Sequence, residues 1–308
     1  MQAQFDPDSA AAWQVRIFKK SAPRKAMLDQ VQRLLPPTEE KACLDIGGRD
    51  GMIPFMLRKR GGSWISADSR ESSVEFMQVI LGDEHVVQLD APRLPFEENC
   101  FDLIVVLEHV ERIREDGEFL KDCHRCLRPD GCLVIHVPHV KSFSALRGIR
   151  SMLGLTPSVL GRVRPGYRLH DLYEISKNGF DIVESRTYGG FLENLIETLM
   201  IKCTGDTSPE QPDDLPPPGE VPDQQVLRNY ASRYRMHAVL YPVVLLCRGL
   251  DRLFRFTCNH SLVVQLKPRP WMERRGVRMR DGRSIADATI NTKIGSAADL
   301  TDPKNNRS

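Results

Sequence analysis

The stretch LDIGGRDG at residues 44–51 decides the fold of this chain, because it joins an apolar run to a glycine turn and a helix. The apolar run at residues 42–46 predicts a short buried strand. The glycines at residues 47–51 predict the turn, and residues 53–57 predict a helix that tolerates Pro54 in its first turn. A strand, a glycine turn and a helix together make the repeating unit of a parallel α/β sheet.

The same alternation continues outward from this unit. Strands are predicted at residues 64–67, 86–89, 101–107, 132–137, 180–186 and 262–266, and helices at 25–35, 72–81, 119–127 and 172–177. Residues 101–107 read FDLIVVL, a nearly continuous apolar run that is expected when helices cover both faces of a parallel sheet. These elements predict an α/β fold with a doubly wound, mostly parallel, seven-stranded sheet.

Two insertions interrupt this core. Residues 140–169 are basic and apolar and contain no acidic residue, and residues 189–260 are largely helical. Within the second insertion, residues 204–225 are acidic and proline-rich, the composition of a disordered linker. The expected parts are a helical N-terminal segment (1–40), a core (41–139, 170–188 and 261–267), the two helical insertions, and a disordered tail (268–308). Both insertions can fold over the ligand edge of the sheet, so we expect them to form a lid.

Bulk composition narrows the class of protein. A chain of 308 residues with 41% hydrophobic content can bury one large core, and its 43 basic and 41 acidic residues nearly cancel. Net charge therefore predicts neither nucleic-acid nor membrane binding. The N-terminus resembles no secretory signal, the apolar run at residues 238–247 is too short to cross a bilayer, and the eight cysteines follow no disulfide framework. We expect a cytoplasmic protein with free thiols.

The glycine turn lies where an open α/β sheet binds its ligand, at the carboxyl ends of the strands and beside a helix N-terminus. Glycines there let a ligand approach the backbone closely. Asp68 ends the next strand, about 20 residues on, and can accept both hydroxyls of a ribose. The turn lacks the G-x-G-x-x-G spacing of a dinucleotide site. The residues therefore predict a nucleoside-like cofactor other than a nicotinamide.

Here the chain resembles the class I S-adenosylmethionine-dependent methyltransferases. LDIGGRDG resembles the first motif of that family, which is usually close to LDIGCGTG. Residues 89–96 resemble its third motif, residues 101–110 its fourth motif in the LEHV variant, and residues 127–133 its LRPGGxL turn. These motifs follow one another in the family's order over residues 41–138. The resemblance implies a Rossmann-like methyltransferase fold and S-adenosylmethionine as the cofactor.

The resemblance also implies which residues bind the cofactor. They are Asp45, Gly47, Gly48, Gly51, Asp68, Ser69, Asp90, Ala91 and Glu108. Asp68 would bind the ribose and Asp90 would lie near the adenine amino group. Asp45 would be costly to bury unpaired, so it holds either the loop or the cofactor's amino group. Arg49 replaces the middle glycine of the family's loop; its side chain either crowds the cofactor, leaving a cofactor-free domain, or points outward and leaves the backbone path intact.

Methyl transfer from a sulfonium is an in-line displacement, so the protein mainly aligns the nucleophile and excludes water. A base is needed only for a protonated nucleophile, and His109, His139 and His170 are the candidate catalytic residues. An alternative for His109 is a structural histidine at a helix start. Cys123 and Cys126 form a C-x-x-C pair on one apolar helix stripe without a second pair, so we expect a core role and no metal.

The composition of the expected lid indicates which molecules this protein binds. A cationic, apolar lid favours a small-molecule acceptor that is apolar, anionic or lipid-linked, with the acceptor atom open among oxygen, nitrogen and carbon. Residues 230–256 combine apolar and basic positions, so we expect either a helix packed on the domain or peripheral membrane contact. The leading hypothesis is a methyltransferase acting on a small-molecule or lipid-type acceptor. A non-catalytic methyltransferase-like binding domain is one alternative. A nucleic-acid methyltransferase is a less favoured one, since no N-P-P-Y-like tetrad follows the fourth strand, and a nucleic-acid partner is not expected. The oligomeric state is left open.

Overall fold

The computed structural model describes residues 9–90, 92–141, 144–204, 224–253 and 259–272. Contacts divide the chain into two units, residues 1–270 and 271–308. The expected linker at residues 204–225 and the expected tail at 268–308 therefore lie largely outside the described residues. All elements named below belong to the first unit.

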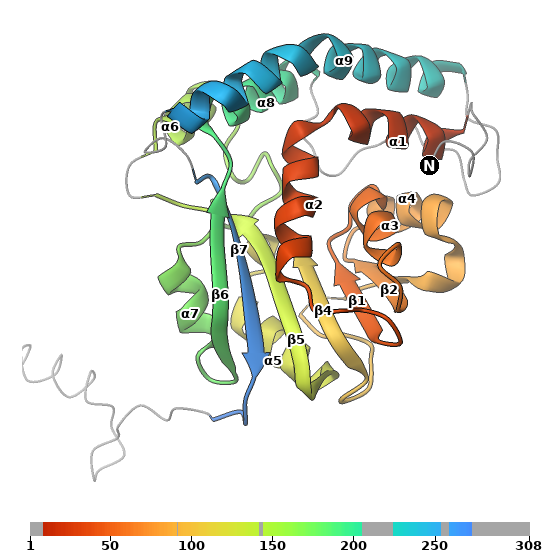
Figure 1. The fold of residues 1–308 in the computed structure, drawn as a ribbon, viewed down its shortest axis with the longest axis vertical. Coiled ribbons are helices and arrows are strands. Elements are labelled where there is room, and N and C mark those ends of the chain that lie inside the picture. The colour runs from red at the N-terminus through yellow and green to blue at the C-terminus, as the bar shows by residue number, and fades with distance from the viewer. Residues whose placement is uncertain (1–8, 91, 142–143, 205–223, 254–258, 273–308) are drawn as a thin grey trace, which may run out of the picture. The chain divides into compact units, whose positions relative to one another are not determined.

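Seven strands form one sheet in the order β3-β2-β1-β4-β5-β7-β6 (Figure 1). The strands are β1 (Ala42–Ile46), β2 (Ser63–Asp68), β3 (Val86–Gln88), β4 (Phe101–Leu107), β5 (Leu127–Pro138), β6 (Phe180–Tyr188) and β7 (Ser261–Pro268). The pairs from β3 to β5 are parallel, whereas β7 runs antiparallel to both β5 and β6. The predicted doubly wound α/β fold with a mostly parallel seven-stranded sheet is confirmed.

Helices cover both faces of the sheet. They are α1 (Ala10–Lys20), α2 (Ala22–Leu34), α3 (Met52–Arg58), α4 (Glu71–Leu81), α5 (Asp116–Cys126), α6 (Ala145–Met152), α7 (Leu169–Ser176), α8 (Phe191–Thr204) and α9 (Gln224–Leu253), with the short 3₁₀ segments η2 (Asp83–His85) and η3 (Val110–Arg112). Figure 1 shows α2 and α3 on one face, with α5 and α7 on the other. Helix α1 was not predicted as a separate element; the Ser9 side chain caps it by accepting a hydrogen bond from the Ala12 amide at 3.2 Å.

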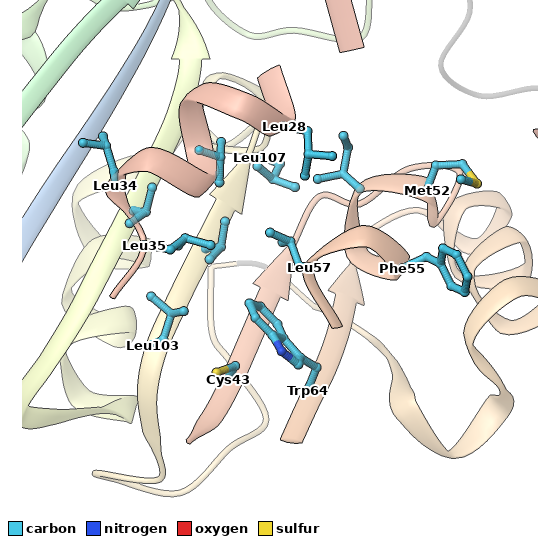
Figure 2. Close-up of a cluster of buried hydrophobic side chains, with 14 of the residues drawn as sticks. Leu28, Leu34, Leu35, Cys43, Met52, Phe55, Leu57, Trp64, Leu103 and Leu107 are labelled. Atoms are coloured by element: carbon cyan, nitrogen blue, oxygen red, sulfur yellow. The ribbon is translucent and has the colours of Figure 1, made fainter. Parts of the chain in front are cut away.

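The main core lies between the sheet and the helices α2 and α3 (Figure 2). Leu28 and Leu34 of α2 pack with Leu103 and Leu107 of β4, and all four side chains are buried. Burial of such side chains stabilises the fold by roughly 1.5–3 kcal/mol each. This packing fixes the upper end of β4, where the ligand edge of the sheet begins.

Three helices lie over the carboxyl ends of the parallel strands (Figure 1), and we call α6, α8 and α9 the lid. Helix α9 packs on α8 and on α1, and α6 packs on α8. Among the described residues, no helix is both long and apolar enough to cross a membrane. The lid is thus built from both insertions that the sequence analysis identified.

Ion pairs hold the first insertion against the core. Arg162 lies 3.5 Å from both Glu108 and Glu111, and Arg164 lies 2.6 Å from Asp116. The Tyr167 hydroxyl donates to the same Asp116 carboxylate at 2.8 Å. Two of the six basic residues of this insertion therefore neutralise acids of the core, so their charges are not available to a ligand in the way the composition suggested.

Candidate functional site

A cavity of about 380 Å³ lies at the carboxyl ends of the strands, beneath the lid. Its wall includes Gly47 and Gly48 of the turn, Glu108 after β4, His136 of β5 and Tyr188 of β6. Side chains of α8 and α9 complete the wall. The volume lies in the range of small-molecule pockets, roughly 300–1,000 Å³. The cavity therefore connects the glycine turn with the inner surface of the lid.

The glycines of the turn are required by packing as well as by the ligand approach that the sequence suggests. Gly47 has φ +86°, and a Cβ built on it would lie 2.1 Å from the Leu107 carbonyl oxygen. A Cβ on Gly48 would lie 2.4 Å from Cγ of Pro54. The turn is thus pressed against β4 on one side and α3 on the other, while its outer surface lines the cavity. Gly51 has φ +71° and stands at the N-terminus of α3, outside the cavity wall.

Two non-glycine residues in the left-handed region face each other at the cavity. Arg49 has φ +52° and Glu108 has φ +48°, and Nη1 of Arg49 lies 4.0 Å from Oε2 of Glu108. Residue 49 keeps a backbone conformation that a glycine would adopt, and its side chain is half-exposed. Non-glycine residues held in this region cluster at functional sites, because the strain needs surrounding structure to maintain it. Arg49 is itself part of the cavity wall, so its side chain does not point wholly away from the site.

Glu108 is ionised in this setting. Burial alone would raise its pKa, but the charges of Arg162, His136, Arg49 and Arg112 outweigh burial and lower the pKa to about 2. Burial and repulsion from Arg49 and Arg70 in turn lower the pKa of Arg112 to about 10. A single carboxylate is therefore surrounded by several guanidinium groups at the cavity wall.

Asp45 lies inside the fold rather than at the cavity. Its side chain is fully buried, accepts from the Ser66 hydroxyl at 2.7 Å and pairs with Arg58 of α3 at 3.3 Å. Burial raises its pKa to about 6, although Arg58 and Ser66 act against this. These contacts join β1 to β2 and α3 rather than to the glycine turn, and Asp45 is not part of the cavity wall, so both of its expected roles stay predictions.

Asp68 ends β2 as expected, but Arg70 covers its carboxylate. The Arg70 amide donates to Asp68 Oδ1 at 3.1 Å, and Nη2 of Arg70 lies 3.4 Å from Oδ2. Asp68 is 1% exposed, and Arg70 lines the cavity in its place. A ribose can reach this carboxylate only after the Arg70 side chain moves.

Two further cofactor candidates, Ser69 and Asp90, lie outside the cavity wall. Ser69 is partly buried next to Asp68, and Asp90 is exposed. Ala91 lies outside the described residues. Of the cofactor residues expected from the sequence, the structure brings Gly47, Gly48 and Glu108 together at the cavity.

None of the three candidate catalytic histidines lines the cavity. His109 is buried below the turn, 5.5 Å from the Phe119 ring, and burial lowers its pKa to about 4. The ring of His139 bonds to the Asn259 carbonyl at 2.8 Å, and His170 is exposed on α7. The structure therefore gives these residues packing or surface positions, and their catalytic role remains only a sequence expectation.

Other histidines do line the cavity, and His136 of β5 is one of them. Its Nε2 lies 2.7 Å from the Tyr188 hydroxyl, while Nδ1 is buried without a hydrogen-bond partner. Burial lowers the pKa of His136 to about 4, with Glu108 acting against it, and burial raises the pKa of Tyr188. Sequence analysis missed this pair, although a histidine within the apolar run CLVIHVP, near the carboxyl end of a strand, was an available signal.

The sheet order, the glycine turn after β1 and the acid ending β2 define a Rossmann-like domain of the class I methyltransferase type. Comparison with known proteins agrees. Residues 44–135 match the family model described as "Methyltransferase domain". This segment of the chain therefore resembles a methyltransferase domain, in agreement with the resemblance found in the sequence.

Individual relatives cover the same part of the chain. A ubiquinone biosynthesis O-methyltransferase of Parvibaculum lavamentivorans is 30% identical over 108 residues, 33% of this chain and 42% of the relative. A protein of Mycobacterium tuberculosis named "Probable S-adenosylmethionine-dependent methyltransferase" is 25% identical over 113 residues, 37% of this chain and 41% of the relative. The chain thus spans less than half the length of these curated relatives.

A solved structure supports the fold. A provisionally assigned methyltransferase of Bacillus halodurans superposes with a TM-score of 0.51 at 13% identity, covering 80% of this chain and 99% of the other. At this identity the likeness concerns the fold alone. The similarity extends beyond the segment that the family model matches.

Proposed function

We propose that this protein transfers a methyl group from S-adenosylmethionine to a hydroxyl of a small-molecule or lipid-type acceptor. The observation that carries the proposal is the single cavity that joins the glycine turn to the His136–Tyr188 pair beneath the lid. Cofactor and acceptor would then meet in line, and the lid would exclude water. The name of the Parvibaculum relative supports oxygen as the acceptor atom.

The residues present fit this cofactor. The backbone of Gly47 and Gly48 would support its methionyl part, and Asp68 would bind the ribose hydroxyls once Arg70 moves. The bound cofactor would supply an electrophilic methyl group on a sulfonium. Glu108, negatively charged at the cavity wall, would favour that positive charge.

His136 would receive the proton that the acceptor hydroxyl loses. When Nε2 carries a hydrogen and donates to Tyr188, Nδ1 is an acceptor without a partner. Its low pKa keeps the ring neutral at pH 7. As the oxygen–methyl bond formed and the methyl–sulfur bond of the cofactor broke, the hydroxyl proton would pass to Nδ1, and Tyr188 would hold the orientation of the imidazolium.

Cofactor binding is the first test. We expect calorimetry to detect binding of S-adenosylmethionine to the purified chain. The Asp68→Ala variant should bind at least about tenfold more weakly, because charged hydrogen bonds to a ribose contribute roughly 1.5–3 kcal/mol each. Asp181→Ala, an exposed acid on β6, is the matched control and should bind like the wild type. Absence of heat in every sample would instead support the non-catalytic alternative.

We also propose that the lid contacts an anionic lipid surface. Helix α9 exposes Val239, Val243, Leu246 and Leu250, which recur at helical spacing. On the described side chains of α6, α8 and α9, every exposed charge is basic; these residues are Arg147, Lys202 and Arg235. Apolar positions beside basic ones match the headgroup region of a membrane that carries negative charge.

Vesicle sedimentation tests this contact. The protein should sediment with phosphatidylcholine vesicles that contain phosphatidylglycerol, and less with phosphatidylcholine alone or in high salt. Leu246→Glu should lose most of the binding, whereas Val183→Glu, an equally drastic change at an exposed apolar residue of β6, should retain it. Wild-type protein that remains in the supernatant would refute the proposal, and dimers in vesicle-free samples would assign the apolar face to a second copy.

A further inference from the structure

The cavity carries an excess of positive charge. Within the described residues, seven arginines and four acidic residues line it, and no lysine does. Several arginines are already paired: Arg24 binds Asp50, and Arg162 lies between Glu108 and Glu111. A concave wall with one prevailing sign of charge concentrates ligands of the opposite sign. Among the arginines of this wall, Arg150 has the contacts that most clearly indicate a role in binding an anion.

Contacts with α8 hold Arg150 in a fixed orientation. Its Nε donates to the Thr198 hydroxyl at 2.9 Å, and that hydroxyl donates to the Asn194 carbonyl at 2.7 Å. Thr198 is fully buried, so this anchor has little freedom. The terminal nitrogens of Arg150 make no hydrogen bond and no ion pair within 4.0 Å among the described residues. The guanidinium group therefore presents its open edge to the cavity that it lines.

The charged groups around Arg150 do not neutralise its guanidinium group, so an added anion can pair with it. Burial lowers its pKa, and Glu197 of α8 acts against this through space, without reaching ion-pair distance. Burial raises the pKa of Glu197, which weakens its competition for the guanidinium. Leu155, Leu160 and Met200 line the same cavity and provide apolar surface. A partly buried, oriented arginine without a counter-ion is costly unless a ligand supplies one.

We propose that Arg150 binds a carboxylate or phosphate group of the methyl acceptor, so that the acceptor is an anionic molecule with an apolar body. A planar guanidinium offers two parallel donors that match either oxyanion. This inference rests on the proposed methyl transfer for the identity of the ligand as acceptor. It assigns the substrate class to a single side chain of the first insertion.

Binding of small anions to the intact chain tests this site. The probes are benzoate and phenyl phosphate, with benzyl alcohol as the uncharged counterpart, and S-adenosylmethionine is titrated into the same samples. We expect the wild type to bind at least one anion and to discriminate against the alcohol by tenfold or more. The stronger of the two anions distinguishes a carboxylate from a phosphate acceptor.

The variants locate the effect. Arg150→Met should bind the anions at least tenfold more weakly with unchanged cofactor affinity, and Arg150→Lys should recover part of the loss. Arg33→Met, at an exposed arginine of α2 outside the cavity wall, is the matched control. If Arg150→Met does not fold, Thr198→Val should show a several-fold loss, because it releases Nε. Equal anion affinity in wild type and variants, or no anion binding by the wild type, overturns this proposal; failure of cofactor binding alone overturns the proposed function instead.

Discussion

Gly47→Ala is expected to lower the free energy of unfolding by about 2–5 kcal/mol. The left-handed backbone of this residue costs an L side chain roughly 1–2 kcal/mol, and a methyl group 2.1 Å from the Leu107 carbonyl adds the cost of overpacking, typically 1–3 kcal/mol. Urea unfolding measures the loss. The turn must shift to relieve the contact, so S-adenosylmethionine binding should be lost as well.

The matched control for Gly47 is Gly154. It also has positive φ, +76°, but a Cβ built there meets nothing within 4 Å. Gly154→Ala should therefore show only the backbone cost, about 1–2 kcal/mol, with cofactor binding retained. Equal losses of stability in the two variants would mean that the contact with Leu107 does not constrain the turn.

His136→Asn is expected to reduce kcat by about 100-fold or more with little change in cofactor affinity. General-base catalysis contributes typically 10²–10⁴-fold, and the variant removes the imidazole that would accept the proton. Turnover is measured by release of S-adenosylhomocysteine with a hydroxyl acceptor. Tyr188→Phe should have a smaller effect on kcat, because it removes only the group that orients the ring.

The pH dependence separates a base from a structural histidine. With a pKa of about 4, His136 is already neutral at pH 5.5, so its protonation should not lower wild-type kcat until the pH falls to about 4. His136 also opposes folding as the pH falls from 6.5 toward 4, because the unfolded chain then binds the proton and the native chain does not. The control variant for His136→Asn is His124→Asn on α5. It also replaces a histidine whose ring makes a hydrogen bond, in this case to the Arg269 carbonyl. Normal turnover by a folded His136→Asn protein would contradict the proposed role.

The fold could be predicted because its signals are local. Continuous apolar runs such as Phe101–Leu107 and the glycine turn after β1 determine strand and helix order without reference to distant residues. Helix α1 was harder to predict as a separate helix, since its boundary with α2 depends on Ser21 and Pro23 rather than on a gap in apolar spacing. The antiparallel placement of β7 between β5 and β6 follows from tertiary pairing, which apolar runs do not encode.

The candidate site was predictable only where the motif itself forms the wall. Gly47, Gly48 and Glu108, which the resemblance implied as cofactor residues, line the cavity, and their binding role stays a prediction. Asp45 and Asp68 were expected at the ligand, but burial and the arginines at positions 58 and 70 determine where their carboxylates point. His136 and Tyr188 come from strands far apart in the chain, so their pairing depends on the β5-β7-β6 order.

The arginines that pair the first insertion with the core affect whether the segment matched by the family model, residues 44–135, can fold alone. Glu108 and Glu111 obtain their counter-charge from Arg162, and Asp116 obtains its own from Arg164, both of which lie beyond the matched residues 44–135. A truncated protein ending after β5 would leave three carboxylates without these partners, two of them on side chains that pack inside the fold. A stretch that looks like an accessory loop therefore supplies part of the charge balance of the segment that the family model matches.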